Sequence, residues 1–355
     1  MTRARVSGEV AAPDLLREIL PGVSRSFALS LQVLPASLRR PVGVTYLVAR
    51  AADTIADTRA LAPAARLAAL HALREFLGEG AGAAPTLSGS AAGGQTLAER
   101  TLLAHLPDVL AAYRALEPGD RTRALEVLLT LTQAMVEALE RFPPEMADRV
   151  GAFDTRADLD RYTHLNAGCV GEFWTDMVVA HRPRCAGWDL PAMRRRGARF
   201  GQGLQLVNVL RDLPRDLRIG RCYLPAADLA ALGLVPQDLL NPAALPRLRP
   251  LLDALIDEAL LRLDEGRAYT LAVPRREARL RLASSWPLLI GLGTLALLRR
   301  AENLLDPTVT VKVSRGEVRW LLARSLALVW SDRGLGVWVR RLANAARARE
   351  GGSRL

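Results

Sequence analysis

Helix-forming side chains run through this sequence from end to end, and they limit the possible folds more than any other feature. Alanine, leucine, arginine and glutamate dominate its segments, and clusters of proline and glycine separate those segments. β-branched residues are sparse and aromatic residues make up 5% of the chain, so strands would lack their usual side chains. The sequence therefore predicts an all-α fold.

The predicted helices fill most of the chain. They cover residues 24–56 as a pair around Pro35, then 63–77, 96–116, 120–141, 155–181, 191–218, 247–272, 277–304 and 315–330. Residues 78–95 contain few bulky side chains and are predicted to form a flexible surface loop. The stretch before this loop is too short to fold alone, and half of the 355 residues are hydrophobic, so we predict one domain over residues 1–355 with a sizeable core.

The net charge of +11 raises the question of a nucleic-acid partner. Lys312 is the only lysine, so 47 of the 48 basic residues are arginine, which is typical of a compositional bias rather than of a binding surface. No helix-turn-helix, zinc-finger or RNA-binding signature accompanies the charge. We therefore expect no nucleic-acid partner. An anionic small substrate or an anionic membrane surface remains as a possible partner for the positive charge. The apolar content also excludes a disordered chain.

The cysteines and the apolar segments bear on the compartment. Cys169, Cys185 and Cys222 are isolated, without a C-x-x-C motif, which favours a reducing, cytoplasmic location. Residues 1–20 contain no apolar run typical of a signal peptide. The uncharged and strongly apolar stretch 282–298 has seventeen residues and is interrupted by Pro287, so we predict a buried core helix rather than a membrane span.

Two pairs of acidic residues are the strongest chemical signal in the sequence. Asp53 and Asp57 lie within YLVARAADTIAD, and Asp212 and Asp216 lie within LQLVNVLRDLPRD. In each D-x-x-x-D pattern the carboxylates are one helical turn apart and share a face, where they repel each other. A divalent cation would relieve that repulsion, and Mg²⁺ prefers one or two carboxylates together with water and phosphate oxygens. The pattern predicts magnesium held over a diphosphate.

Two acidic faces exposed to solvent would be the simpler explanation of these pairs. Their surroundings argue against it, because each pair is embedded in an otherwise apolar helix. Arg50 precedes Asp53 by three residues, and Arg211 directly precedes Asp212. Acid pairs beside arginine in an apolar wall indicate a site for metal and phosphate.

Several motifs resemble those of the squalene and phytoene synthases. They are SRSF at 24–27, LP-x-x-LR at 34–39, YLVARAADTIAD, YTHLNAGCVG at 162–171, and NVLRDLPRD followed by Arg221. WPLLIGLGTLALL and VKVSRGEV are similar to the squalene synthase branch in particular, and the matches span roughly residues 24–320. The resemblance implies a single-domain, isoprenoid-synthase-type helical bundle with a central cavity, which joins two isoprenyl diphosphates head to head.

The resemblance also implies roles for individual residues. Asp53, Asp57, Asp212 and Asp216 would be the catalytic ligands of Mg²⁺. Tyr162 matches the base that removes a proton during cyclopropane closure, although a core aromatic residue is the alternative explanation. The remaining matches are substrate-binding positions, namely Tyr46, Arg25, Arg50, Arg211, Arg221, Gln205 and Asn208.

A nicotinamide cofactor is implied by the resemblance alone. The glycines at 201 and 203 are not a dinucleotide fingerprint, because position 206 is leucine and no strand precedes them. Squalene synthases bind NADPH without that fold, through basic residues that match Arg25, Arg50, Arg211, Lys312 and Arg315. Ser314 and Ala56 depart from the family pattern, and they leave the cofactor geometry and the number of metal ions open.

The activity implied is the Mg²⁺-dependent condensation of two farnesyl diphosphates to presqualene diphosphate, followed by reduction to squalene with NADPH. Sibling products are presqualene diphosphate itself, hydroxysqualene, dehydrosqualene or phytoene, and Lys312 with the extended C-terminus favours squalene. A non-catalytic helical scaffold would be expected to lose acids from the two pairs, and both pairs are complete. We expect a monomer.

A membrane-surface role stays open as an addition to the catalytic one. Residues 333–355 carry six arginines and one glutamate, with Trp330 and Trp338 nearby. That composition suits a helix resting on the inner face of the membrane. A solvated basic tail explains it equally well.

Overall fold

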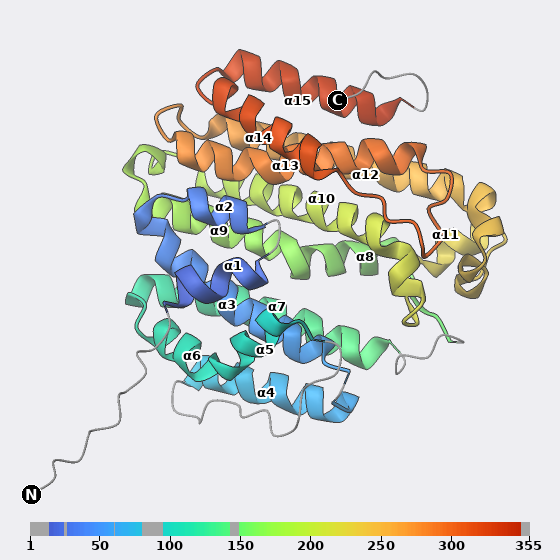
Figure 1. Ribbon diagram of the computed structural model, residues 1–355, viewed down its shortest axis with the longest axis horizontal. Coiled ribbons are helices and arrows are strands. Elements are labelled where there is room, and N and C mark those ends of the chain that lie inside the picture. The colour runs from blue at the N-terminus through green and yellow to red at the C-terminus, as the bar shows by residue number, and fades with distance from the viewer. Residues whose placement is uncertain (1–13, 25–26, 60, 80–94, 143–148, 349–355) are drawn as a thin grey trace, which may run out of the picture.

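Helices stacked in layers form nearly the whole molecule in the computed structural model, which describes residues 14–24, 27–59, 61–79, 95–142 and 149–348 (Figure 1). The predicted all-α fold is confirmed. The N-terminal half contains α1 (Leu20–Val23), α2 (Phe27–Val33), α3 (Ala36–Asp57), α4 (Pro63–Glu79), α5 (Leu97–Ala104), α6 (Leu106–Arg114) and α7 (Pro118–Arg141). A π-helical turn, η1 (Leu15–Ile19), precedes α1.

The second half begins with a short strand and continues with the longest helices. Its elements are β1 (Gly151–Phe153), α8 (Arg156–Thr163), the π-helical turn η2 (His164–Gly168), α9 (Cys169–His181), α10 (Leu190–Leu217), β2 (Arg221–Pro225), α11 (Ala226–Ala231), α12 (Leu245–Ala272), α13 (Ala278–Arg300), α14 (Arg315–Leu328) and α15 (Asp332–Arg347). Short 3₁₀ turns lie at η3 (Pro183–Cys185), η4 (Pro236–Leu240) and η5 (Pro242–Ala244).

The predicted helix boundaries are mostly confirmed, with two interruptions. The predicted helix at 96–116 is two helices, α5 and α6, because Pro107 in the first turn of α6 lacks the N–H that would continue the earlier helix. The predicted helix at 155–181 is divided by η2. The predicted loop at 78–95 starts inside the last turn of α4, and its residues 80–94 lie outside the described part of the chain.

The segment predicted as a basic tail is for the most part a packed helix. In α15, Leu335, Trp338 and Leu342 are at most 5% exposed and belong to the core formed with α12 and α13. The apolar face of α15 is therefore covered by the protein, and contact with a membrane stays a prediction. The arginines of α15 lie on its outer side.

The hydrophobic core has two parts. One is built mainly from α1 to α7 and α9, and the other from α10, β2 and α12 to α15. The parts meet where α9 and η2 pack against α10, and glycine makes this contact possible. A Cβ atom on Gly171 would lie 1.9 Å from the carbonyl oxygen of Gly197, and one on Gly201 would lie 2.1 Å from that of Ala167. The backbones of the two segments therefore touch directly.

A two-stranded parallel sheet completes the junction. Gly151 of β1 pairs with Arg221 of β2, and the register shifts after Ala152. Because β2 follows directly on the end of α10, this pairing fixes Arg221 and Tyr223 beside the second acidic pair.

The helix α13 contains the stretch predicted to be a core helix. Among the described residues it alone is long and apolar enough to cross a membrane, and 78% of its most apolar window is buried inside the protein. Cys169, Cys185 and Cys222 are free and buried.

Candidate active site

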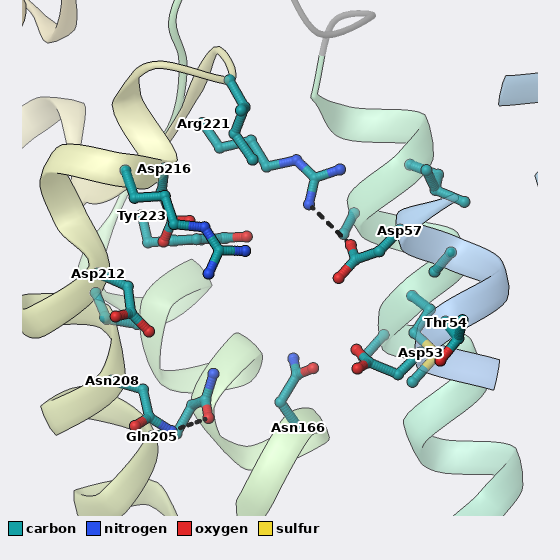
Figure 2. Close-up of a pocket in the computed structure, with 18 of the residues that line it drawn as sticks. Asp53, Thr54, Asp57, Asn166, Gln205, Asn208, Asp212, Asp216, Arg221 and Tyr223 are labelled. Atoms are coloured by element: carbon teal, nitrogen blue, oxygen red, sulfur yellow. Dashed lines mark hydrogen bonds and ion pairs between the residues drawn. The ribbon is translucent and has the colours of Figure 1, made fainter. Parts of the chain in front are cut away.

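A cavity of about 540 Å³ lies between the two parts of the core, and both acidic pairs line it. Its walls come from α3, α5, α7, η2, α10 and β2. Figure 2 shows the carboxylates of α3 on one side and those of α10 on the other, with polar side chains between them. The sequence places each pair on one helical face, and the fold turns those two faces toward each other.

The wall from α3 presents Asp53 and Asp57, one turn apart. The opposite face of the helix holds Ala51, Ala52 and Ile55, which are fully buried and fix its rotation. Asp53 is paired with Arg50, one turn earlier on the same helix. Since the Asp57 side chain is 59% exposed, it can take up a ligand without first being released from the core.

The wall from α10 presents Asp212 and Asp216. Arg211 donates two hydrogen bonds to Asp212, at 2.8 Å from Nε and 2.6 Å from Nη2. Burial, together with the nearby carboxylates of Asp212 and Asp57, raises the pKa of Asp216 to about 7. Since Asp57 is one of the charges that raise the pKa of Asp216, the carboxylates of the two walls repel each other across the cavity.

Arg221 bridges the two walls. Its Nη1 atom lies 3.9 Å from Oδ1 of Asp57, so a side chain anchored beside α10 reaches the pair on α3 (Figure 2). Arg59 and Arg215 also line the cavity. The planar guanidinium group can meet two phosphate oxygens at once, so these arginines suit a diphosphate.

The predicted tyrosine and the predicted amides form one chain of contacts. Nε2 of Gln205 lies 3.5 Å from the Tyr162 hydroxyl, and Asn208 donates to Oε1 of Gln205 at 3.3 Å. The Tyr162 ring stacks on Tyr223 with centroids 4.5 Å apart. Burial, together with Tyr223, holds the pKa of Tyr162 well above its ordinary value. The phenol is therefore protonated at neutral pH and can accept a proton only while it passes its own onward.

The donor set of the cavity fits magnesium shared with a phosphorylated substrate. Within the described residues, no three of the His, Cys, Asp and Glu side chains gather closely enough to hold a metal ion by themselves. The two pairs instead offer carboxylate oxygens from opposite walls. Mg²⁺ is usually held by one or two carboxylates, with water and phosphate oxygens completing its shell. Asp53, Asp57, Asp212 and Asp216 are thus positioned to share it with a diphosphate.

Some residues predicted for the site lie elsewhere. The Tyr46 hydroxyl donates to the carbonyl of Val23 at 3.4 Å, and Tyr46 does not line the cavity described here. Lys312 and Arg315 are exposed, and neither lines the cavity. Their resemblance to cofactor-binding positions therefore lacks support from the geometry. Arg25 lies outside the described residues.

Of the lining residues that were not predicted for the site, Glu99, Asn166 and Tyr223 contact predicted ones. Glu99 pairs with Arg50 and also closes the capping box of α5 with Thr96, so the T-x-x-E pattern was a visible signal for its position. Asn166 donates to the carbonyl of Tyr162 at 2.9 Å and faces the cavity from η2 (Figure 2). Tyr223 lies two residues after Arg221, but only the strand pairing brings it to Tyr162.

The fold and this cavity define an all-α protein in which two acidic pairs face each other across one cavity. The chain belongs to the squalene/phytoene synthase family, whose sequence profile matches residues 20–317. This membership confirms the resemblance, and with it the expectation of a family of prenyltransferases.

Two curated relatives and three solved structures show the extent of the similarity. A squalene synthase of Eremothecium gossypii is 26% identical over 87% of this chain and 66% of its own length. Squalene synthase BSS of Botryococcus braunii is 31% identical over 56% of this chain and 40% of its own length. The chain thus spans less than two thirds of either relative.

The solved structures share the fold at low identity. A structure of TcSQS with a ligand has a TM-score of 0.73 at 23% identity, covering 94% of this chain and 97% of that one. A dehydrosqualene synthase gives a TM-score of 0.63 at 20% identity, covering 89% and 95% of the two chains. Squalene synthase HpnC from Alicyclobacillus acidocaldarius gives 0.53 at 23% identity, covering 79% and 92%.

Proposed function

We propose that this chain condenses two farnesyl diphosphates head to head into presqualene diphosphate, with Mg²⁺, and then reduces that product to squalene with NADPH. The observation that carries the proposal is the pair of facing D-x-x-x-D walls on α3 and α10 around one cavity. The curated relatives described as squalene synthases support the choice of substrate.

The diphosphate end of the substrate would lie between the two walls. When bound there, Mg²⁺ neutralises the charge of the leaving diphosphate and so favours its release. Arg50 and Arg211 already make ion pairs with Asp53 and Asp212, so each could contact phosphate oxygens while it orients its acid. Arg221 is placed to close the site from the side of β2.

The apolar chain and the allylic cation need surroundings that exclude water. Met135, Ala138 and Leu139 of α7 line the cavity together with Val209 of α10. Such a wall keeps water away from a carbocation that it would otherwise trap.

Proton removal during ring closure falls to Tyr162. Its hydroxyl lies within reach of Gln205, and its raised pKa requires the proton to leave the phenol as another arrives. The released diphosphate is the acceptor with the greatest basicity in such a site. Tyr162→Phe should therefore lower turnover strongly while leaving substrate affinity nearly unchanged, which steady-state kcat and KM would separate.

A second candidate function is favoured by one observation. Because Lys312 and Arg315 are exposed and lie outside the cavity, they do not form a cofactor site with Arg50 and Arg211. An enzyme that stops at presqualene diphosphate, or releases hydroxysqualene, dehydrosqualene or phytoene, would need no such site.

Product identification by mass separates these candidates. The purified full chain is incubated with farnesyl diphosphate and Mg²⁺, with and without NADPH. Squalene formed only with NADPH supports the complete reaction, and presqualene diphosphate or hydroxysqualene in both mixtures supports the second candidate. No product from farnesyl or geranylgeranyl diphosphate would overturn the catalytic proposal.

A further inference from the structure

The helix α5 presents to the cavity a carboxylate that belongs to neither acidic pair. Glu99 lines the cavity from α5, and its side chain is 13% exposed. Its Oε1 atom accepts a hydrogen bond from Nη2 of Arg50 on α3. Arg50 also donates from Nη1 to Oδ2 of Asp53, so one guanidinium group holds two acids. Glu99 and Asp53 therefore share Arg50.

Glu99 is held in place independently of Asp53. Its Oε2 atom accepts hydrogen bonds from the backbone N–H and the hydroxyl of Thr96, at 2.8 and 2.9 Å, in the capping box of α5. Both oxygens of the carboxylate are thereby engaged, one by its own helix and the other by Arg50. The orientation of Glu99 therefore does not depend on where the Asp53 side chain points.

The start of α5 is fastened to α3 on both sides of the acidic pair. The contact with Arg50 lies three residues before Asp53. Gln95, just before α5, donates from Nε2 to Oγ1 of Thr58, which directly follows Asp57. The two helices pack against each other, and α5 lies beside α3 in Figure 1. The beginning of α5 is therefore a fixed part of this wall of the cavity.

The three side chains differ in how far they are exposed. Arg50 is 17% exposed and Glu99 is 13% exposed, whereas Asp53 is 41% exposed. A guanidinium group buried to this extent is costly to leave without an acid, because it has lost most of its contact with water. With Glu99 in place, Asp53 can turn toward a ligand in the cavity while Arg50 keeps an acidic partner.

The wall from α10 has no corresponding anchor. Arg211 donates to Asp212 from both Nε and Nη2, and among the described residues no second acid forms an ion pair with Arg211. The Arg211 side chain is 34% exposed, against 17% for Arg50, so water can replace its acid more easily. The more deeply buried of the two arginines is thus the one that has a second carboxylate.

We propose that Glu99 is a positioning residue, which holds Arg50 and so frees Asp53 to bind Mg²⁺ together with a diphosphate. This role rests on the proposed function, because it takes the cavity to be the site of the diphosphate. Without the Glu99 carboxylate, Arg50 depends on Asp53 alone for charge compensation at this wall, and the two side chains hold each other more tightly. Since both oxygens of Glu99 are engaged, the acid acts through Arg50 and Asp53.

Calorimetric binding of inorganic diphosphate to the full chain in the presence of Mg²⁺ tests the role of Glu99. Glu99→Gln should weaken binding by about tenfold or more, the usual contribution of a hydrogen bond to a charged group. Glu99→Asp should weaken it as well, because the carboxylate is then one methylene group further from Arg50. The aspartate can still complete the capping box, as Asp158 does with Thr155 in α8, so this variant keeps α5 capped.

Combination with Asp53→Asn separates positioning from a general loss of structure. Because Glu99 acts through Asp53, Glu99→Gln should cause no further loss of affinity in a chain that already carries Asp53→Asn. Glu317→Gln is the matched control, since it removes the same charge from the capping box of α14, outside the cavity. It should bind diphosphate as the unaltered chain does, and thermal melts check that all variants fold.

Two results would disprove this role of Glu99. One is that Glu99→Gln and Glu99→Asp bind diphosphate with Mg²⁺ as tightly as the control does, and the other is that the losses from Glu99→Gln and Asp53→Asn multiply. Either result leaves the two facing walls, and hence the proposed function, intact. If the unaltered chain shows no Mg²⁺-dependent binding, the diphosphate site itself is contradicted, and the role of Glu99 with it.

Discussion

A spacing of four residues between carboxylates decides what each wall of the cavity can do. On α3 and on α10 it puts two acids on one face, and each first acid has an arginine partner. The second acids lack such close pairing, and Asp216 responds with a pKa of about 7. At the scale of the residue, the carboxylates of the site repel each other, and a bound cation would relieve that repulsion.

Removing one carboxylate charge from either wall should impair catalysis without unfolding the protein. Asp53→Asn and Asp212→Asn should each lower kcat by about a hundredfold or more, the usual cost of losing one preorganised electrostatic partner. Glu75→Gln, an exposed acid on α4, is the control with the same charge change. Thermal melts should be similar for all three variants. Full activity in either aspartate variant would contradict the metal assignment.

The pKa of Asp216 predicts how stability varies with pH in metal-free protein. Its pKa rises from 3.8 in an exposed carboxyl to about 7 in the folded state, so the native state holds the proton more tightly than the unfolded chain. The stability that this contributes is fully present below about pH 4 and is lost as pH rises through 7. Asp216→Asn should therefore be more stable than the unaltered chain at pH 8, and less sensitive to pH between 5 and 8. Tm is measured against pH for both proteins in the presence of a chelator. If Tm of Asp216→Asn and Tm of the unaltered chain depend on pH in the same way, the raised pKa of Asp216 is contradicted.

At the scale of the element, much of the architecture follows from the sequence. The helix pair around Pro35, the long helix carrying the second acid pair and the core helix α13 were all predicted, because composition and apolar context determine them locally. The burial of the apolar face of α15 was not, since an amphipathic helix looks alike whether protein or lipid covers it. The contact between Tyr162 and Tyr223 depends on strand pairing between distant segments, which no local pattern records.

The glycines at the backbone contact between α9 and α10 should not be replaceable by a residue with a side chain. Gly171→Ala places a methyl group within 1.9 Å of a carbonyl oxygen, so the helices must separate. We expect a loss of about 3 kcal/mol or more in the free energy of unfolding, because backbone atoms cannot move aside as a side chain can. Gly187→Ala is the control, since nothing lies within 4 Å of its added Cβ. Denaturant titration of both variants makes the comparison, and equal stability would disprove the close approach.

The packing of α15 can be measured in the same way. Leu342 is 5% exposed within the core, so Leu342→Ala should destabilise the protein by about 2–5 kcal/mol. Leu97→Ala on α5, where the side chain is 72% exposed, should change stability by less than about 0.5 kcal/mol. If both variants unfold at the same denaturant concentration, α15 is not part of the core.

At the scale of the whole molecule, the cavity exists because two hydrophobic cores meet along α9, η2 and α10. Each core carries one acidic pair to the junction, and Arg221 crosses between them. The sequence identifies both pairs and their chemistry, but only the packing of the two halves makes them a single site. The same packing leaves Lys312 and Arg315 outside this cavity. The resemblance of their sequence motif to the family could not reveal that position.

Calorimetric binding of inorganic diphosphate, with and without Mg²⁺, tests most directly whether the two walls form one site. The unaltered chain is compared with Asp53→Asn, Asp212→Asn and the double variant. We predict tight binding only with Mg²⁺, a loss of about tenfold or more in each single variant, and a double loss smaller than the product of the two, because both acids act on one ligand. Binding that does not depend on Mg²⁺, or fully independent losses from the two walls, would contradict the account.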